Sequence, residues 1–146
     1  MKLGFEVWGR VRRPLDRVFR AVQAPKELSA YFTTGGASGP LEAGKTVMWD
    51  FADFPGAFPV EVKRCTRNKS VVLAWGSQTG GKNRVEFRFK KIGPRATEVR
   101  IREGGWPNTP KGRKAAFGNC MGWSQMLAAM KAWCEHGINL RKGFYK

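Results

Sequence analysis

Residues 111–137 read KGRKAAFGNCMGWSQMLAAMKAWCEHG. Apolar side chains recur in this stretch at intervals of three and four residues, which places them on one face of a helix; they are Phe117, Cys120, Trp123, Leu127, Met130 and Cys134. Gly137 follows His136, and glycine accepts the left-handed conformation that ends a helix. The stretch therefore predicts one long amphipathic helix that ends near Gly137.

Earlier segments alternate between apolar and polar side chains, which is the two-residue period of half-buried strands. Six strands are predicted in this way, at residues 3–12, 46–54, 58–66, 70–77, 84–90 and 97–103. Turn-forming residues separate the last five strands, at Pro55-Gly56, Arg67–Lys69, Thr79–Lys82 and Gly93-Pro94. These five strands are predicted to form a meander.

Two short helices and a loop are predicted between the first and second strands. Apolar residues recur at helical spacing over residues 15–23, Pro25 can begin a second helix that reaches Phe32, and the glycine-rich residues 34–40 indicate a loop. This order of elements predicts an α+β helix-grip fold, in which a curved antiparallel sheet of six to seven strands wraps around the long helix. We expect residues 1–138 to form a single domain and residues 139–146 a basic tail.

Composition limits the compartment and the kind of cross-link. No apolar run has the length of a signal peptide or a membrane span, so we expect a cytoplasmic protein with no membrane insertion. The three cysteines, Cys65, Cys120 and Cys134, include no CxxC pair. We therefore expect reduced thiols, with neither a disulfide framework nor a structural zinc site.

Four stretches carry a family resemblance: RVRRPLDRVFRAVQAPKEL (residues 10–28), FPVEVKRCTRNKSVVLAW (58–75), VRIREGGW (99–106) and GWSQMLAAMKAWCEHG (122–137). In these stretches the chain resembles the activator of heat-shock-protein ATPase homologue-like family of the START-related SRPBCC superfamily. The resemblance implies a helix-grip fold with a largely apolar cavity between the long helix and the sheet. Such cavities often hold a small hydrophobic ligand.

A ligand cavity can be assigned from the side chains that should face inward from sheet and helix. The candidates are Trp49, Phe51, Phe58, Trp75, Phe87, Val99, Glu103, Trp106, Trp123, Leu127 and Met130. The alternative is that these residues only pack as core. Among polar groups that could orient a ligand, Asp50, Asp53 and Glu103 are candidates, unless each carboxylate pairs with one of the many arginines.

Catalytic and metal sites find little support in the sequence. His136 is the only histidine and lies at a predicted helix end, so neither a Ser-His-Asp nor a Cys-His site is expected. The glycine-rich segments at residues 35–40 and 79–82 lack the context of a phosphate-binding loop. We expect no catalytic residue, no metal and no cofactor.

The net charge of +16, from 27 Lys and Arg against 11 Asp and Glu, requires that an anionic partner be considered. In a helix-grip sheet the first strand lies beside the last, which brings one set of outward side chains together: Trp8, Arg10, Arg12, Arg84, Arg88, Lys90, Arg100 and Arg102. We hypothesise that this face binds RNA, single-stranded DNA or an acidic protein. The alternative is a solvated face, since Glu86 and Glu98 interrupt it.

Three functions follow from these observations. The first is a non-catalytic domain that binds a small hydrophobic molecule. The second is an interaction module that uses the basic face, as a chaperone co-factor or a binder of anionic partners. The third is an enzyme in which a single carboxyl or tyrosine acts on a cavity-bound substrate. The chain is expected to be a monomer or a homodimer.

Overall fold

Seven strands form one antiparallel sheet, and the computed structural model describes this sheet and three helices over residues 1–146. The elements in chain order are β1 (Lys2–Val11), α1 (Leu15–Gln23), α2 (Pro25–Tyr31), β2 (Gly36–Ala37), β3 (Thr46–Phe51), β4 (Phe54–Thr66), β5 (Ser70–Gly76), β6 (Lys82–Gly93), β7 (Ala96–Pro107) and α3 (Pro110–His136). The strands lie in the order β1-β7-β6-β5-β4-β3-β2. The predicted helix-grip fold is confirmed.

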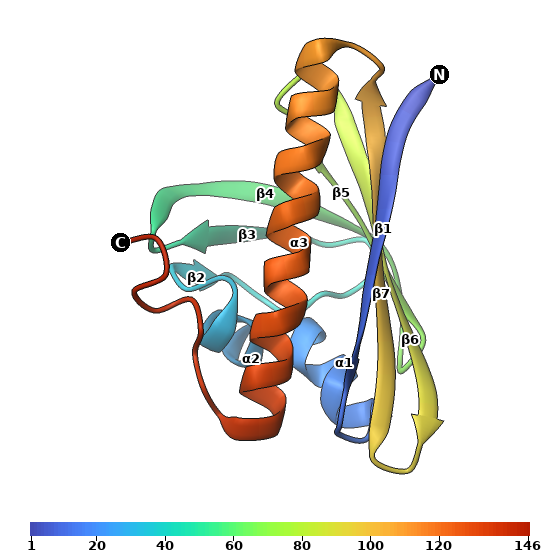
Figure 1. Cartoon of the computed structure of the whole chain (residues 1–146), viewed down its shortest axis with the longest axis vertical. Coiled ribbons are helices and arrows are strands. Elements are labelled where there is room, and N and C mark those ends of the chain that lie inside the picture. Colours follow the sequence, from blue (N-terminus) through green and yellow to red (C-terminus); the bar gives the residue numbers. More distant parts are fainter.

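The sheet curves around α3, with α1 and α2 at one end of the layer (Figure 1). Inward and outward rows follow directly from the strand register. Val7 lies opposite Ile101, and Ile101 lies opposite Phe87, which builds an apolar inward row across β1, β7 and β6. Trp8, Arg100 and Arg88 form the neighbouring outward row. Alternation in the sequence thus separates a core face from a charged face.

The predicted long helix is confirmed, including its end. Thr109 caps its first turn by accepting a hydrogen bond from the Gly112 N–H at 3.0 Å, and Gly137 ends it with a φ of 68°. No helix in the structure has the length and hydropathy to cross a lipid bilayer.

The predicted place of Phe117 on the buried stripe is wrong, because its side chain is 71% exposed. Gly112 and Ala116 are the buried residues in the first turns of α3. A Cβ at Gly112 would lie 1.9 Å from the Pro107 carbonyl oxygen, so the helix meets the end of β7 there in close backbone contact. This contact fixes which side of α3 faces the sheet, and it turns Phe117 outward.

The predicted turn at Pro55-Gly56 is also wrong. Phe51 pairs with Phe54 across the turn Ala52-Asp53, so that Pro55 and Gly56 lie within β4. The Gly56 N–H donates to Asp50 Oδ1 at 2.9 Å, and Gly56 has a φ of 135°. In the predicted loop over residues 34–40, Gly36 and Ala37 instead pair with β3 as the short edge strand β2.

Candidate functional site

Aromatic rings fill the space between α3 and the sheet. Trp123 lies at their centre, with ring centroids 5.5 Å from Phe32, 5.4 Å from Trp75 and 5.4 Å from Phe87. Trp49 meets Trp75 edge-on at 5.9 Å. Several predicted cavity residues are therefore fully packed core side chains; they are Trp49, Phe87, Val99, Trp106, Leu127 and Met130.

Glu103 is completely buried behind these rings, and neutral donors supply all of its hydrogen bonds. Its Oε1 accepts from Trp123 Nε1 at 2.8 Å and from Asn119 Nδ2 at 3.0 Å. Its Oε2 accepts from Trp75 Nε1 at 2.8 Å and from Asn83 Nδ2 at 3.0 Å. Asn119 also reaches Oε2, at 3.2 Å. The alternative of an arginine partner is wrong for Glu103, although it holds for Asp53.

The carboxylate of Glu103 positions both indoles. Each of its oxygens accepts from one of them, and a buried N–H with no acceptor would be unfavourable. Trp75 and Trp123 are consequently held nearly parallel, with an interplanar angle of 26°. Both residues also form part of a pocket wall. Glu103 therefore determines the shape of that wall without lining it.

The pocket itself lies at the mouth of the grip and has a volume of about 280 Å³. Its walls come from the end of α2, the β3–β4 hairpin, β5, the middle of α3 and the residues after α3. The lining residues are Phe32, Phe51, Phe54, Trp75, Gly118, Asn119, Met121, Gly122, Trp123, Gln125, Arg141 and Tyr145. Of the predicted cavity residues, Phe51, Trp75 and Trp123 line it. Phe58 packs behind them, 5.8 Å from Phe51 and 5.7 Å from Trp75.

Two glycines on α3 keep this pocket empty on the helix side. Gly118 and Gly122 are one helical turn apart, and a Cβ at either would meet nothing within 4 Å. Neither glycine was assigned from the sequence, although small residues four positions apart on an amphipathic helix lie on one face and can indicate a space beside it.

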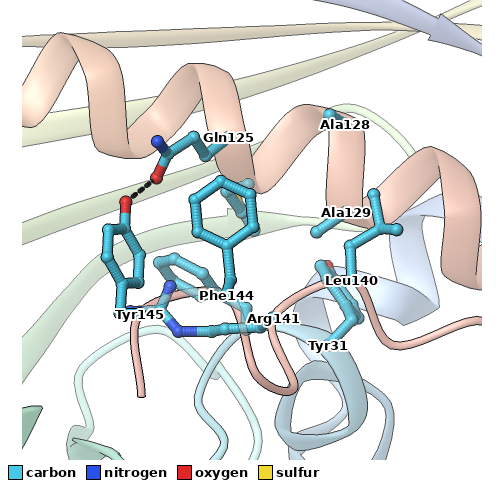
Figure 2. A pocket seen from close by; sticks show the side chains of 10 residues that line it. Tyr31, Gln125, Ala128, Ala129, Leu140, Arg141, Phe144 and Tyr145 are labelled. Carbon is cyan, nitrogen blue, oxygen red and sulfur yellow. Dashed lines mark hydrogen bonds between the residues drawn. The ribbon is translucent and has the colours of Figure 1, made fainter. Parts of the chain in front are cut away.

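Residues 139–146 were expected to be a basic tail, and in the structure they pack against the domain. The chain turns back after α3 and runs toward the β3–β4 hairpin (Figure 1). The Tyr145 hydroxyl donates to Gln125 Oε1 of α3 (Figure 2). A smaller pocket of about 80 Å³ lies between this segment, α2 and α3, with Tyr31, Leu140 and Phe144 in its walls (Figure 2).

Tyr31 joins this smaller pocket to the core. Its hydroxyl donates to the Ala21 carbonyl oxygen at 3.0 Å. Burial raises the pKa of Tyr31 well above its ordinary value, so the phenol stays protonated.

Arg141 anchors the returning segment. Its Nε lies 3.0 Å from Asp53 Oδ2, and its Nη2 lies 3.2 Å from Asp53 Oδ1. The guanidinium carbon lies 4.6 Å from the ring centroid of Phe51, 5.8 Å from that of Phe32 and 5.9 Å from that of Tyr145. Only 16% of the Arg141 side chain is exposed. Sequence reasoning missed Arg141, because no periodic pattern links it to Asp53.

The predicted basic face is present on the outer side of the sheet, except for Arg12. The guanidinium of Arg100 lies 5.1 Å from the ring centroid of Trp8, which is 55% exposed. Arg12 follows the last residue of β1 and pairs with Glu135 of α3 at 3.3 Å. Its place in the patch was therefore predicted wrongly, because the alternation that put it there ends with the strand.

Ion pairs reduce the charge of this face without removing it. Glu98 lies 2.8 Å from Arg100, Glu86 lies 3.1 Å from Arg88, and Glu6 lies 3.4 Å from Arg102. The hydrogen bond from Arg100 lowers the pKa of Glu98, so this carboxylate remains ionised. Arg10 and Lys90 of the predicted face form no ion pair, and neither do the neighbouring Arg64 and Lys69.

Arg64 was not assigned to this face from the sequence. A register shift in β4 between Val62 and Arg64 changes the alternation and turns Arg64 outward, opposite Val72. Arg64 lines a groove of about 630 Å³ on the face together with Thr66, Lys69, Ser70, Arg88 and Lys90.

Known proteins match both the sequence and the fold. Residues 12–135 match the profile of a family described as Activator of Hsp90 ATPase homolog 1-like protein. None of the curated protein sequences matches the chain.

Three solved structures illustrate the shared fold. The crystal structure of a Staphylococcus saprophyticus protein is 22% identical, with a TM-score of 0.81 over 95% of this chain and 96% of that one. DynU16, from the dynemicin biosynthetic locus, is 25% identical, with a TM-score of 0.77 over 92% of this chain and 48% of that one. The Aha1 dimer of Colwellia psychrerythraea is 17% identical, with a TM-score of 0.76 over 92% of this chain and 98% of that one.

Proposed function

The chain belongs to the Activator of Hsp90 ATPase homolog 1-like family, and we propose that it is a binding domain for a small, largely apolar molecule held at the mouth of the helix grip. The observation that carries this proposal is the aromatic pocket of about 280 Å³ between Trp75, Trp123 and Phe51. Ligand sites are typically concave, mostly apolar and supplied with a few placed polar groups. Asn119, Gln125 and Arg141 are the polar groups here.

The size of the pocket limits the ligand. Pockets for drug-sized ligands have volumes of about 300–1,000 Å³, so this pocket is suited to one small ring system rather than to a lipid. The indoles of Trp75 and Trp123 stack on each other and line the pocket, so they supply an apolar aromatic surface for a ring of the ligand. Glu103 holds that surface rigid, which lowers the entropic cost of binding.

Native mass spectrometry of the freshly purified chain tests this proposal. We expect a bound small molecule that is lost on denaturation. A matched pair of variants locates it: Gly122→Leu places a side chain in the pocket and should abolish the adduct, whereas Ser124→Leu adds the same side chain at an exposed position of α3 and should retain it. An adduct that survives in Gly122→Leu would contradict binding in this pocket.

A second proposal concerns the outer face of the sheet, and it is favoured by the exposed Trp8 beside Arg100. We propose that this face binds single-stranded nucleic acid, because a base can stack on Trp8 while the unpaired Arg10, Arg64 and Lys90 meet phosphates. For three to four phosphate contacts, raising salt from about 50 to 200 mM should weaken binding about 20- to 50-fold.

Fluorescence anisotropy with a labelled single strand measures this binding. Trp8→Ala should weaken it, and Lys114→Ala, an exposed charge on α3 away from the face, should not. Equal effects of the two substitutions would argue against a defined site. Salt-independent binding, or preference for a polyglutamate peptide over the single strand, would reject nucleic acid as the partner.

A further inference from the structure

Arg141 occupies a site whose features suit a cation. Three aromatic rings surround its guanidinium, at centroid distances of 4.6 Å for Phe51, 5.8 Å for Phe32 and 5.9 Å for Tyr145. The faces of such rings carry the negative part of the ring quadrupole and attract positive charge. Asp53 closes the site, because its carboxylate accepts two hydrogen bonds from Nε and one from Nη2 of Arg141.

This site is directly connected to the proposed ligand pocket. Arg141 is the one residue that lines the 280 Å³ pocket, the 80 Å³ pocket and a third pocket of about 250 Å³ beside Asp53. Movement of Arg141 would therefore join these spaces into one chamber, with Asp53, Phe32 and Phe51 in the walls that stay in place. Glu103 adds a second buried carboxylate behind the indoles of Trp75 and Trp123.

The segment that carries Arg141 is suited to movement. It contains neither helix nor strand, it follows the helix-ending Gly137, and Gly143 within it has a φ of 72°. Apart from the Arg141 contacts, its side-chain hydrogen bond to the domain is the one from Tyr145 to Gln125. Displacing the segment would leave the sheet and α3 unchanged.

We propose that the vacated chamber binds an organic cation, an amine, guanidinium or quaternary ammonium group on a small apolar body, and that Arg141 fills the cation's place in its absence. This proposal rests on the proposed ligand-binding function and names the chemical class of the ligand. A ligand that displaces Arg141 must itself bring a positive charge, because Asp53 would otherwise remain buried without a partner. An anion would face both Asp53 and Glu103, and a neutral molecule would leave Asp53 unpaired.

Three probes of similar size separate the ligand classes: phenyltrimethylammonium, its uncharged isostere tert-butylbenzene, and benzoate. Isothermal titration calorimetry with the full chain measures the affinity for each. In Arg141→Ala, we expect phenyltrimethylammonium to bind at least tenfold more tightly than to the wild type, and at least tenfold more tightly than tert-butylbenzene. When Asp53→Asn is added to this variant, phenyltrimethylammonium should bind no more tightly than it does to the wild type, and no more tightly than tert-butylbenzene.

A measurement on the wild type keeps the test independent of how well the variants fold. Phenyltrimethylammonium should increase deuterium uptake by backbone amides of residues 139–146, and tert-butylbenzene should not.

The outcomes distinguish this inference from the function on which it rests. Binding of tert-butylbenzene or benzoate as tightly as the cation would overturn the cation inference and leave an apolar ligand site in place. The cation inference would also be overturned if phenyltrimethylammonium bound to the double variant Arg141→Ala with Asp53→Asn as tightly as to Arg141→Ala alone. If none of the three probes binds to either form, and no adduct is found in the native protein, both the inference and the proposed function fail.

Discussion

Replacing Glu103 by glutamine tests whether this buried carboxylate organises the pocket wall. Glutamine has the same shape, but one carboxylate oxygen becomes an NH₂ group that donates rather than accepts. Each oxygen accepts from one indole, Oε1 from Trp123 and Oε2 from Trp75. Whichever oxygen is replaced, one indole N–H loses its acceptor, and a neighbouring asparagine amide loses one too.

The size of the effect follows from these contacts. A buried donor left without an acceptor costs about 1–3 kcal/mol, and the remaining hydrogen bonds lose the strengthening that a charged acceptor gives. We therefore expect Glu103→Gln to lower the free energy of unfolding by about 2–4 kcal/mol. At roughly 3 °C per kcal/mol for a domain of this size, the melting temperature should fall by about 6–12 °C.

Urea unfolding followed by tryptophan fluorescence measures the free energy, and near-ultraviolet circular dichroism reports the packing of the two indoles. Trp75→Phe removes one of the donors, so the double variant with Glu103→Gln should lose about 1–2 kcal/mol less than the two single losses together. Glu42→Gln, an exposed carboxylate paired with Lys45, is the control and should unfold as the wild type does. A loss below about 0.5 kcal/mol for Glu103→Gln, or strict additivity with Trp75→Phe, would refute this account of Glu103.

Replacing two glycines of α3 by alanine should change stability in opposite directions. The Cβ of Gly118→Ala enters open space, so this variant should be about 1 kcal/mol more stable through helix propensity, as measured by chemical denaturation. Gly112→Ala would place its Cβ 1.9 Å from the Pro107 carbonyl oxygen and should destabilise the protein by about 1–3 kcal/mol; an unchanged midpoint would mean that α3 and β7 can separate freely. Burial would raise the pKa of Glu135, but hydrogen bonds from the Arg12 backbone N–H and from Lys131 lower it from 4.5 to about 2. Ionised Glu135 therefore stabilises the folded state by at most about 3 kcal/mol above pH 4.5, and this stabilisation is lost as the pH falls toward 2. In Glu135→Gln, the free energy of unfolding should vary less with pH between 4.5 and 2. The same pH dependence in the variant and the wild type would contradict this role of Glu135.

Local patterns in the sequence were enough to predict six of the seven strands, the three helices and their order, whereas the short edge strand β2 was missed. The end of α3 follows from Gly137 alone, and the two faces of β6 and β7 follow from alternation. Phe117 was misplaced because helical spacing allows more than one face, and the close contact of Gly112 with Pro107 that selects the face joins two elements. The β3–β4 turn was misplaced because a proline and a glycine can also lie in a strand at an irregular register.

The pocket was only partly predictable for a related reason. Phe51, Trp75 and Trp123 could be assigned because each faces inward on a regular element. Arg141 and Tyr145 lie beyond α3 and reach the pocket through a reversal of the chain, for which no repeating pattern exists. The pairing of Asp53 with Arg141 spans 88 positions of sequence and appears only once the chain is folded.

The pairing of β1 with β7 also has a consequence for the newly made chain. Lys2 of β1 meets Pro107 of β7, so the first strand has no neighbour until almost the whole sheet has been synthesised. At translation rates of about 5–20 residues per second, this strand waits roughly 5–20 s after it emerges from the ribosome. Its backbone N–H and C=O groups stay available to other chains throughout that interval. Aggregation during synthesis should therefore depend more on the sequence of β1 than on that of any later strand.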